Sequence, residues 1–153
     1  MKFDRRQSAG YVVNQLARLF AQALYHRTRR HGVTPGEFPV LLMLWEQEGA
    51  TQAELARRLA VGQPTLANTL RRMERDRLIE RLPDPEDGRR ARIHLTAYGK
   101  RLEKTVTASA RDANAVALAG LSGAERQQFL DLAHRLIGNL EQEAEEWELS
   151  YDA

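Results

Sequence analysis

The chain has 153 residues, of which 42% are hydrophobic and 29% are charged, a composition typical of one soluble globular domain. It contains no cysteine, which excludes a disulfide framework, a thiolate zinc site and a thiol-based redox sensor. The N-terminal residues lack the apolar stretch of a signal peptide, and the apolar run at 38–45 is too short to cross a bilayer. We therefore expect a cytoplasmic protein.

The net charge of +2 is unevenly distributed along the chain. Residues 1–50 carry seven Lys and Arg against four Asp and Glu, and residues 51–104 carry thirteen against eight. Residues 105–153 carry only three against nine. A basic centre followed by an acidic end indicates that one surface meets a polyanion while another does not, although solvated helices of varying charge would give the same numbers.

Helix-start signals divide the chain into segments. Thr34, Thr51 and Ser122 are each followed three residues later by a glutamate, which is the capping-box pattern, and Thr96 is a fourth expected cap. Apolar residues spaced three or four apart continue from these caps, as they do in helices with one buried face. The second segment is apolar nearly all round, which predicts a buried central helix. The predicted helices span about 8–31, 35–48, 52–59, 63–77, 97–119 and 123–148.

The hydrophobic period changes after the fourth helix. Residues 79–82 and 91–95 alternate apolar and polar side chains, as half-buried strands do. The segment between them contains Pro83, Pro85 and Gly88, which suit a hairpin loop. The sequence therefore predicts a β-hairpin directly after a pair of short helices.

This order of elements predicts a fold that is mainly α with a small β-hairpin wing. A winged helix-turn-helix at about 35–95 is embedded between N- and C-terminal dimerisation helices, at about 8–31 and 97–148. The first and last helices have apolar stripes left to bury, which favours pairing of two copies. We expect residues 1–153 to form a single domain.

The helix-turn-helix has an inner apolar face and an outer polar one. Gln and Asn side chains can pair with adenine, Arg with guanine, and Thr hydroxyls with phosphate or base. The start of the second helix also offers unpaired backbone N–H groups to phosphates. The DNA contacts predicted on this unit are Thr51, Gln52, Gln63, Pro64, Thr65, Asn68, Thr69 and Arg72.

The predicted hairpin is basic near its tip. Arg89, Arg90 and Arg92 follow Gly88, and guanidinium groups on a narrow loop can enter a minor groove. Three acids lie beside them, and we expect Asp87 to form a salt bridge with Arg89 that orients this arginine. Charged residues on a solvated helix face are the alternative interpretation for the other arginines of the region, Arg75 and Arg77 above all.

These motifs resemble the MarR family of transcriptional regulators. The similarity covers nearly the whole chain and is most specific at 52–59, 63–68, 76–81, 87–90 and 95–99. It implies a homodimer with interleaved first and last helices, a palindromic operator, a recognition helix in the major groove and a wing in the minor groove. It also implies a repressor that is released by a small aromatic or anionic molecule. Two departures are Ala60, where Gly is common, and Gly62, where a Ser or Thr usually caps the recognition helix.

A cleft between the first two helices and the winged unit is the expected effector site. His26, Phe38, Met43 and Trp45 are its candidate lining residues, and a basic residue nearby would hold an aromatic carboxylate. The alternative is that these aromatic side chains are plain core.

Two further hypotheses belong to other classes of protein. The winged helix could be a protein–protein or architectural module without sequence-specific DNA binding. An enzyme would need a converging set of catalytic groups, and four histidines without cysteine are sparse material for one. We therefore predict no catalytic residue, no metal site and no cofactor, with a metal-sensing variant left as an alternative. The predicted partners are double-stranded DNA, a second copy of the chain and a small-molecule effector, without a membrane.

Overall fold

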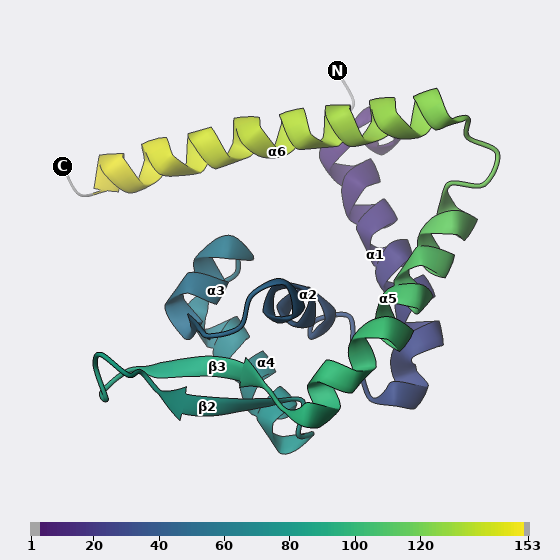
Figure 1. The fold of residues 1–153 in the computed structure, drawn as a ribbon. Coiled ribbons are helices and arrows are strands. Elements are labelled where there is room, and N and C mark those ends of the chain that lie inside the picture. The colour runs from purple at the N-terminus through teal and green to yellow at the C-terminus, as the bar shows by residue number, and fades with distance from the viewer. Residues whose placement is uncertain (1–3, 152–153) are drawn as a thin grey trace. The chain divides into compact units, whose positions relative to one another are not determined.

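The computed structural model describes the backbone of residues 4–151 and the side chains of residues 4–144. By packing, the chain divides into two compact units, and the boundary along the sequence falls between Asn114 and Ala115. The single domain expected from the sequence stays a prediction. Figure 1 shows the elements, which are η1 (Arg5–Gln7), α1 (Ala9–Thr28), η2 (Arg29–His31), α2 (Phe38–Glu46), β1 (Ala50–Thr51), α3 (Gln52–Arg58), α4 (Gln63–Arg75), β2 (Ile79–Pro83), β3 (Ala91–Leu95), α5 (Ala97–Ala117) and α6 (Gly123–Tyr151).

The predicted caps explain most helix starts. The Thr51 hydroxyl accepts a hydrogen bond from the Glu54 N–H at 3.2 Å, and the Glu54 carboxylate accepts one from the Thr51 N–H at 2.7 Å. Ser122 and Glu125 form the same reciprocal pair, at 3.3 and 2.7 Å. Each pair satisfies two backbone N–H donors that a helix start would otherwise leave open. These capping boxes are confirmed.

The box at Thr34 forms only in part, which corrects the predicted start of the second helix. The Glu37 carboxylate accepts a hydrogen bond from the Thr34 N–H at 2.9 Å, but the buried Thr34 hydroxyl has no partner among the described residues. Residues 35–37 form a turn, and α2 begins at Phe38 instead of near 35. The first helix likewise ends as an α-helix at Thr28, with its last predicted turn wound as η2.

The wing is a three-stranded antiparallel sheet in the order β1-β3-β2. Strands β2 and β3 pair from Ile79 opposite Leu95 to Pro83 opposite Ala91, as the alternating pattern predicted. The strand that the sequence did not predict is β1, which places Ala50 opposite Ile93. It has two residues, too few to show a period.

The core of the winged unit lies between α2, α3, α4 and the sheet. The prediction of a buried central helix is confirmed, since Val40, Leu41 and Leu44 of α2 are at most 1% exposed. Side chains from the surrounding elements that are also fully covered are Leu55, Leu66, Leu70, Met73, Leu78 and Ile93. Burial of this kind stabilises a fold by roughly 1.5–3 kcal/mol per large side chain.

Large apolar side chains remain exposed on the two outer helices. On α1 they are Tyr11, Val12, Val13, Leu19 and Tyr25, and on the described part of α6 they are Phe129, Leu130, Leu132, Leu136, Ile137 and Leu140. The helical spacing of Leu140, Ala144 and Trp147 also predicts that Trp147 turns inward, but this side chain lies outside the residues whose side chains are described. No helix within the described range is both long and apolar enough to span a membrane.

The start of α5 approaches Leu78, the residue before β2, so closely that only glycine fits. A Cβ atom added to Gly99 would lie 2.2 Å from the Leu78 carbonyl oxygen. The Gly99 carbonyl in turn accepts a hydrogen bond from the Trp45 indole at 3.0 Å. Thr96 caps α5, as predicted, by accepting a hydrogen bond from the Gly99 N–H at 3.0 Å. The junction of α2, β2 and α5 therefore depends on one residue without a side chain.

We expect Gly99→Ala to lower the free energy of unfolding by at least about 2 kcal/mol, because backbone must move to admit the new methyl group. Denaturant unfolding at one fixed protein concentration measures this. Gly123→Ala is the matched control, since a Cβ there meets nothing within 4 Å, and we expect it to be neutral or slightly stabilising. Equal stability of the two variants would contradict the close approach.

Candidate nucleic-acid interface

The recognition helix α4 buries one face and exposes the other. Leu66, Leu70 and Met73 are at most 2% exposed and pack into the core. Gly62 occupies the N-cap position in extended backbone geometry, and no side chain caps the helix there. The first N–H groups of α4 are therefore open to an anion such as a phosphate. The predicted contact residues that lie on the exposed side are Gln63, Pro64, Thr65, Asn68 and Arg72.

Thr69, predicted to face outward as a DNA contact, is buried instead. Its side chain is buried, and its hydroxyl donates a hydrogen bond to the Thr65 carbonyl at 3.2 Å. The same oxygen accepts a hydrogen bond from the Arg72 guanidinium at 3.4 Å. The helical period places Thr69 on the boundary between the two faces, where sequence alone cannot decide its orientation. In the structure Thr69 accepts a hydrogen bond from Arg72 instead of facing outward.

Polar side chains connect α4 with α3 and the sheet. The Gln52 amide donates to the Gln63 side chain at 3.3 Å, and the Arg81 guanidinium donates to Gln52 at 3.4 Å. Arg81 also pairs with Glu74 at 3.0 Å. Gln52 and Gln63 were predicted from the sequence, whereas the supporting roles of Arg81 and Glu74 were missed. Glu74 lies on α4 and Arg81 on β2, and no local sequence pattern predicts a contact between a helix and a strand.

Asn68 and Thr51, two further predicted contact residues, also have partners within the protein. The Arg71 guanidinium donates a hydrogen bond to the Asn68 side-chain oxygen. A bidentate contact with adenine would use the same oxygen, so Arg71 would have to share it or release it. The Thr51 hydroxyl is occupied by its capping box. Arg71 was not among the residues that the sequence singled out.

The loop between β2 and β3 projects beyond α3 and α4 (Figure 1) and is braced by Arg92. The Arg92 guanidinium donates to the Asp84 carboxylate at 2.7 Å and to the Gly49 carbonyl at 2.9 Å. Asp84 is almost fully buried, and its other oxygen accepts the Glu86 N–H at 2.9 Å. Arg92 therefore ties the wing tip to the segment before β1, a supporting role that differs from the predicted direct contact with DNA.

The salt bridge expected between Asp87 and Arg89 is replaced by another pair. Asp87 lies 3.4 Å from the Arg90 guanidinium and accepts only the backbone N–H of Arg89, at 3.1 Å. The turn of the loop brings the residue three positions along, and not two, to the carboxylate. Among the described residues no acid pairs with the Arg89 guanidinium, which leaves it exposed at the wing tip.

A pocket of about 420 Å³ lies between α1, α2 and α5. Phe20, Leu24 and Phe38 contribute to its apolar wall, and Thr107, Arg111 and Asn114 of α5 supply its polar groups. Of the predicted effector residues, only Phe38 lines this pocket. The remaining lining residues are Ala21, Pro35, Leu42, Ala110 and Ala113.

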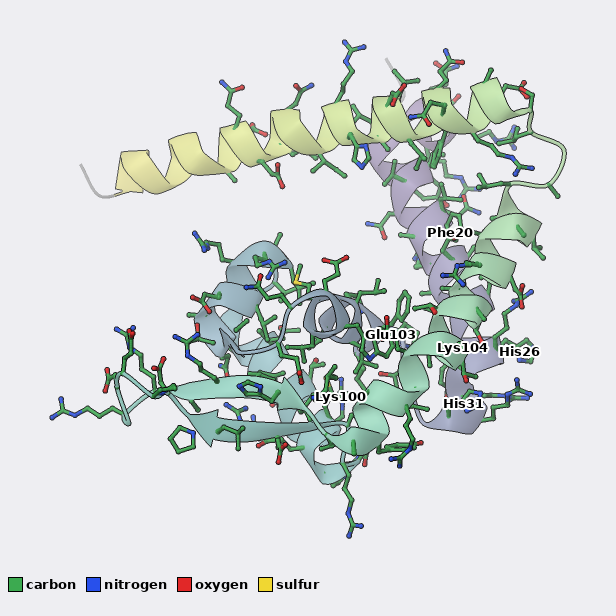
Figure 2. All side chains as sticks on the ribbon, in the orientation of Figure 1. Phe20, His26, His31, Lys100, Glu103 and Lys104 are labelled. Atoms are coloured by element: carbon green, nitrogen blue, oxygen red, sulfur yellow. The ribbon has the colours of Figure 1, made fainter. Side chains whose placement is uncertain are left out.

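The other predicted effector residues have different surroundings. Met43 and Trp45 pack against the hydrophobic core, as the alternative interpretation of these side chains had it. His26 is exposed near the C-terminal end of α1, whereas Phe20 lies further back along the same helix (Figure 2). Arg111 was missed because a single basic residue on a long amphipathic helix gives no signal of its own. Within the described part of the chain, no group of three His, Asp or Glu side chains could hold a metal ion.

A helix-turn-helix with a polar outer face, followed at once by an arginine-bearing wing, defines a winged helix-turn-helix DNA-binding protein. A model described as the MarR family matches residues 31–90. The transcriptional regulator HosA of Escherichia coli O111:H- is 30% identical over 128 residues, which are 81% of this chain and 93% of that protein. The chain belongs to the MarR family, a class of DNA-binding transcriptional regulators and not of enzymes, as the sequence predicted.

Solved structures agree with this assignment over most of the chain. The S. aureus MepR–DNA complex is 26% identical with a TM-score of 0.78 and covers 86% of this chain and 98% of its own. PcaV of Streptomyces coelicolor, in complex with its natural ligand, is 26% identical with a TM-score of 0.79 and covers 90% of this chain and 97% of its own. The fold of this chain is thus that of winged-helix regulators.

The Asp84 brace makes the wing sensitive to acid. The Glu86 N–H lowers the pKa of Asp84 most, burial opposes this, and Arg92 lowers the pKa further. A depressed pKa means that the brace contributes fully above the unfolded value of about 3.9 and is lost as pH falls through the lower folded value. We therefore expect the Nε–H resonance of Arg92, which donates to Asp84, to titrate with a midpoint below about 3.9.

Asp84→Asn should abolish this titration and reduce the loss of thermal stability between about pH 4 and pH 2. Asp112→Asn, which removes an exposed carboxylate from α5, is the matched control and should leave both measurements unchanged. An Arg92 Nε–H resonance that titrates at or above the unfolded value, or that still titrates in Asp84→Asn, would show that Asp84 does not brace the wing.

Proposed function

We propose that the chain is a homodimeric repressor that binds an inverted-repeat operator in the cytoplasm. The observation that carries the proposal is the combination of a polar outer face on α4 with uncovered apolar side chains on α1 and α6. Leu140 of α6 is 65% exposed and Leu19 of α1 is 54% exposed. A second copy would cover these side chains, because apolar surface of this extent is rarely left in water. Such a dimer would also join residues 1–153 into a single domain.

The two-fold symmetry of a dimer would set the form of the operator. Two recognition helices one turn of DNA apart, ~34 Å, read two inverted half-sites. The exposed residues of α4 would enter the major groove, with Gln63, Thr65 and Asn68 nearest to the base edges. Thr51 and Gln52, at the start of α3, would lie on the phosphate backbone. Arg89 and Arg90 at the wing tip would enter the minor groove, and MepR, a relative of this chain, has been crystallised with DNA.

Selection of binding sites from a pool of random DNA duplexes tests this proposal. We expect an inverted repeat whose half-sites are centred one helical turn apart, and a footprint with matching two-fold symmetry. The competing hypothesis is a protein–protein or architectural module, which predicts no enriched sequence. Recovery of no repeat would decide for that module and against the repressor.

Substitutions on α4 and on the wing should have different effects. We expect Asn68→Ala to weaken binding to the selected operator about ten- to a hundredfold, with little change on random DNA, because a base contact carries specificity. Removing Arg89 and Arg90 together should weaken binding to both DNAs and lower the salt dependence by about one unit per lost phosphate contact. Arg101→Ala, which removes one positive charge from α5, is the control. Equal losses from all three changes on both DNAs would contradict these roles.

We further propose that the pocket between α1, α2 and α5 binds a small aromatic carboxylate and that binding releases the operator. The volume of about 420 Å³ falls within the usual range for small-molecule sites. An aromatic ring would pack against Phe20 and Phe38, and Arg111 would pair with the carboxylate. PcaV, whose structure contains its natural ligand, is a relative of this chain.

Calorimetric titration with benzoate and 4-hydroxybenzoate, after a thermal-shift screen of phenolic acids, measures this binding. Arg111→Gln should weaken it at least about tenfold, because a charge-assisted hydrogen bond is lost. Arg101→Gln, which does not line the pocket, should bind as the unchanged protein does. No thermal shift across a broad panel of aromatic acids would reject this class of effector.

A further inference from the structure

The turn between η2 and α2 has two sides with different neighbours. Pro35 and Phe38 line the pocket between α1, α2 and α5. Gly36 and Glu37, which lie between them in sequence, face the recognition helix instead. A Cβ on Gly36 would lie 3.9 Å from the Arg72 guanidinium, and a Glu37 oxygen lies 3.9 Å from the Arg72 Nε. Four consecutive residues therefore connect the pocket with α4.

Glu37 is a buried carboxylate whose two oxygens have different partners. Its side chain is 1% exposed, so its charge is costly unless it is paired and hydrogen-bonded. One oxygen accepts the Thr34 N–H at 2.9 Å, which fixes the carboxylate to the turn itself. The other faces Arg72 of α4. The position of the turn therefore sets the position of the carboxylate, and with it the distance between the carboxylate and Arg72.

Arg72 is held from two directions. Its Nε faces Glu37, and its terminal nitrogen donates to the Thr69 hydroxyl at 3.4 Å. The Arg72 side chain remains 49% exposed on the side of α4 that we propose to face DNA. At 3.9 Å the Glu37–Arg72 pair is at the outer limit of an ion pair, so a displacement of the turn by about 1 Å would take it beyond contact distance and weaken the attraction.

We propose that Glu37 is a positioning residue through which occupation of the pocket controls Arg72 on the recognition helix. With the pocket empty, Glu37 holds the Arg72 guanidinium in the orientation that binds DNA. A group that fills the pocket displaces Pro35 and Phe38, and the turn carries Glu37 away from Arg72. This inference rests on the proposed function, because it assigns the contact by which the pocket would act on the operator.

A double-mutant cycle tests the connection without a known effector. Ala110→Phe fills the pocket from α5, and Glu37→Gln removes the charge while its side-chain oxygen still accepts the Thr34 N–H. We expect Ala110→Phe to weaken binding to the selected operator at least about tenfold in the unchanged background and less than about threefold in Glu37→Gln. Arg72→Gln should reduce the effect of Ala110→Phe in the same way, which provides a second background if Glu37→Gln does not fold.

Glu74→Gln is the matched control for the cycle. It neutralises a carboxylate that pairs with Arg81 at 3.0 Å on the same helix, but Glu74 does not border the pocket. The full effect of Ala110→Phe should persist in this background, whatever the operator affinity of Glu74→Gln itself. An equal effect of Ala110→Phe in the Glu37→Gln and Glu74→Gln backgrounds would overturn the proposal, and so would no effect in the unchanged protein.

A measurement without DNA separates this inference from the proposed function. The Nε–H resonance of Arg72, identified by its absence in Arg72→Gln, reports the surroundings of the guanidinium directly. We expect Ala110→Phe to shift this resonance in the otherwise unchanged protein and not in Glu37→Gln. If site selection recovers no operator and the resonance still responds, the proposed repressor fails while the connection stands. If Ala110→Phe does not shift the Arg72 resonance, the connection between the pocket and Arg72 is refuted.

Discussion

The contact between Gly99 and the Leu78 carbonyl is the constraint on which the winged unit depends. It brings the first turn of α5 onto the end of α4 and the start of β2, where the Thr96 N–H also donates to the Leu78 carbonyl, at 3.1 Å. The Trp45 indole adds a hydrogen bond from α2 to the same glycine. The next charge along α5, Lys100, pairs with Glu48 at 2.9 Å beside the sheet (Figure 2). The direction in which α5 leaves the sheet is thereby fixed, and with it the wall of the pocket that α5 provides.

The arginines of the basic centre divide by their partners. Arg81 and Arg92 each pair closely with an acid that is buried or half-buried, and their guanidinium groups hold one element against another. Arg89 and Arg90 stand at the wing tip, where water screens any pairing. A count of positive charges therefore overstates how many arginines can meet a polyanion. The arginines that are paired within the protein hold the elements in place, and the exposed arginines are the ones available to a polyanion.

Local patterns were sufficient for the helices and for two of the strands. Thr51 with Glu54 and Ser122 with Glu125 form complete capping boxes, because every partner of such a box lies within four residues. Prediction failed where the partner is distant in the sequence. Strand β1 exists only because β3 offers it an edge, and the buried Thr34 hydroxyl shows that a capping pattern can be present while its bond does not form. These outcomes depend on tertiary packing, which overrides local preference.

In the candidate site, too, the features set by local pattern were predicted and those set by distant contacts were not. The exposed positions of α4 were predicted from its period, and Phe38, a predicted effector residue, lines a pocket. The orientation of Thr69, the pairing of Asp87 with Arg90 and the place of Arg111 were not, because each depends on a boundary position, a loop conformation or a helix crossing. None of these three leaves a periodic trace in the sequence.

The shape of the sheet has a consequence for solubility. A sheet with open edges can recruit strands from other molecules and so begin aggregation. Here one outer strand, β1, is only two residues long and offers few free backbone groups. The other, β2, carries Glu80 and Arg81 and ends at Pro83, which has no N–H to donate. Neither edge is a template for a further strand, so the sheet is protected against strand addition from other molecules.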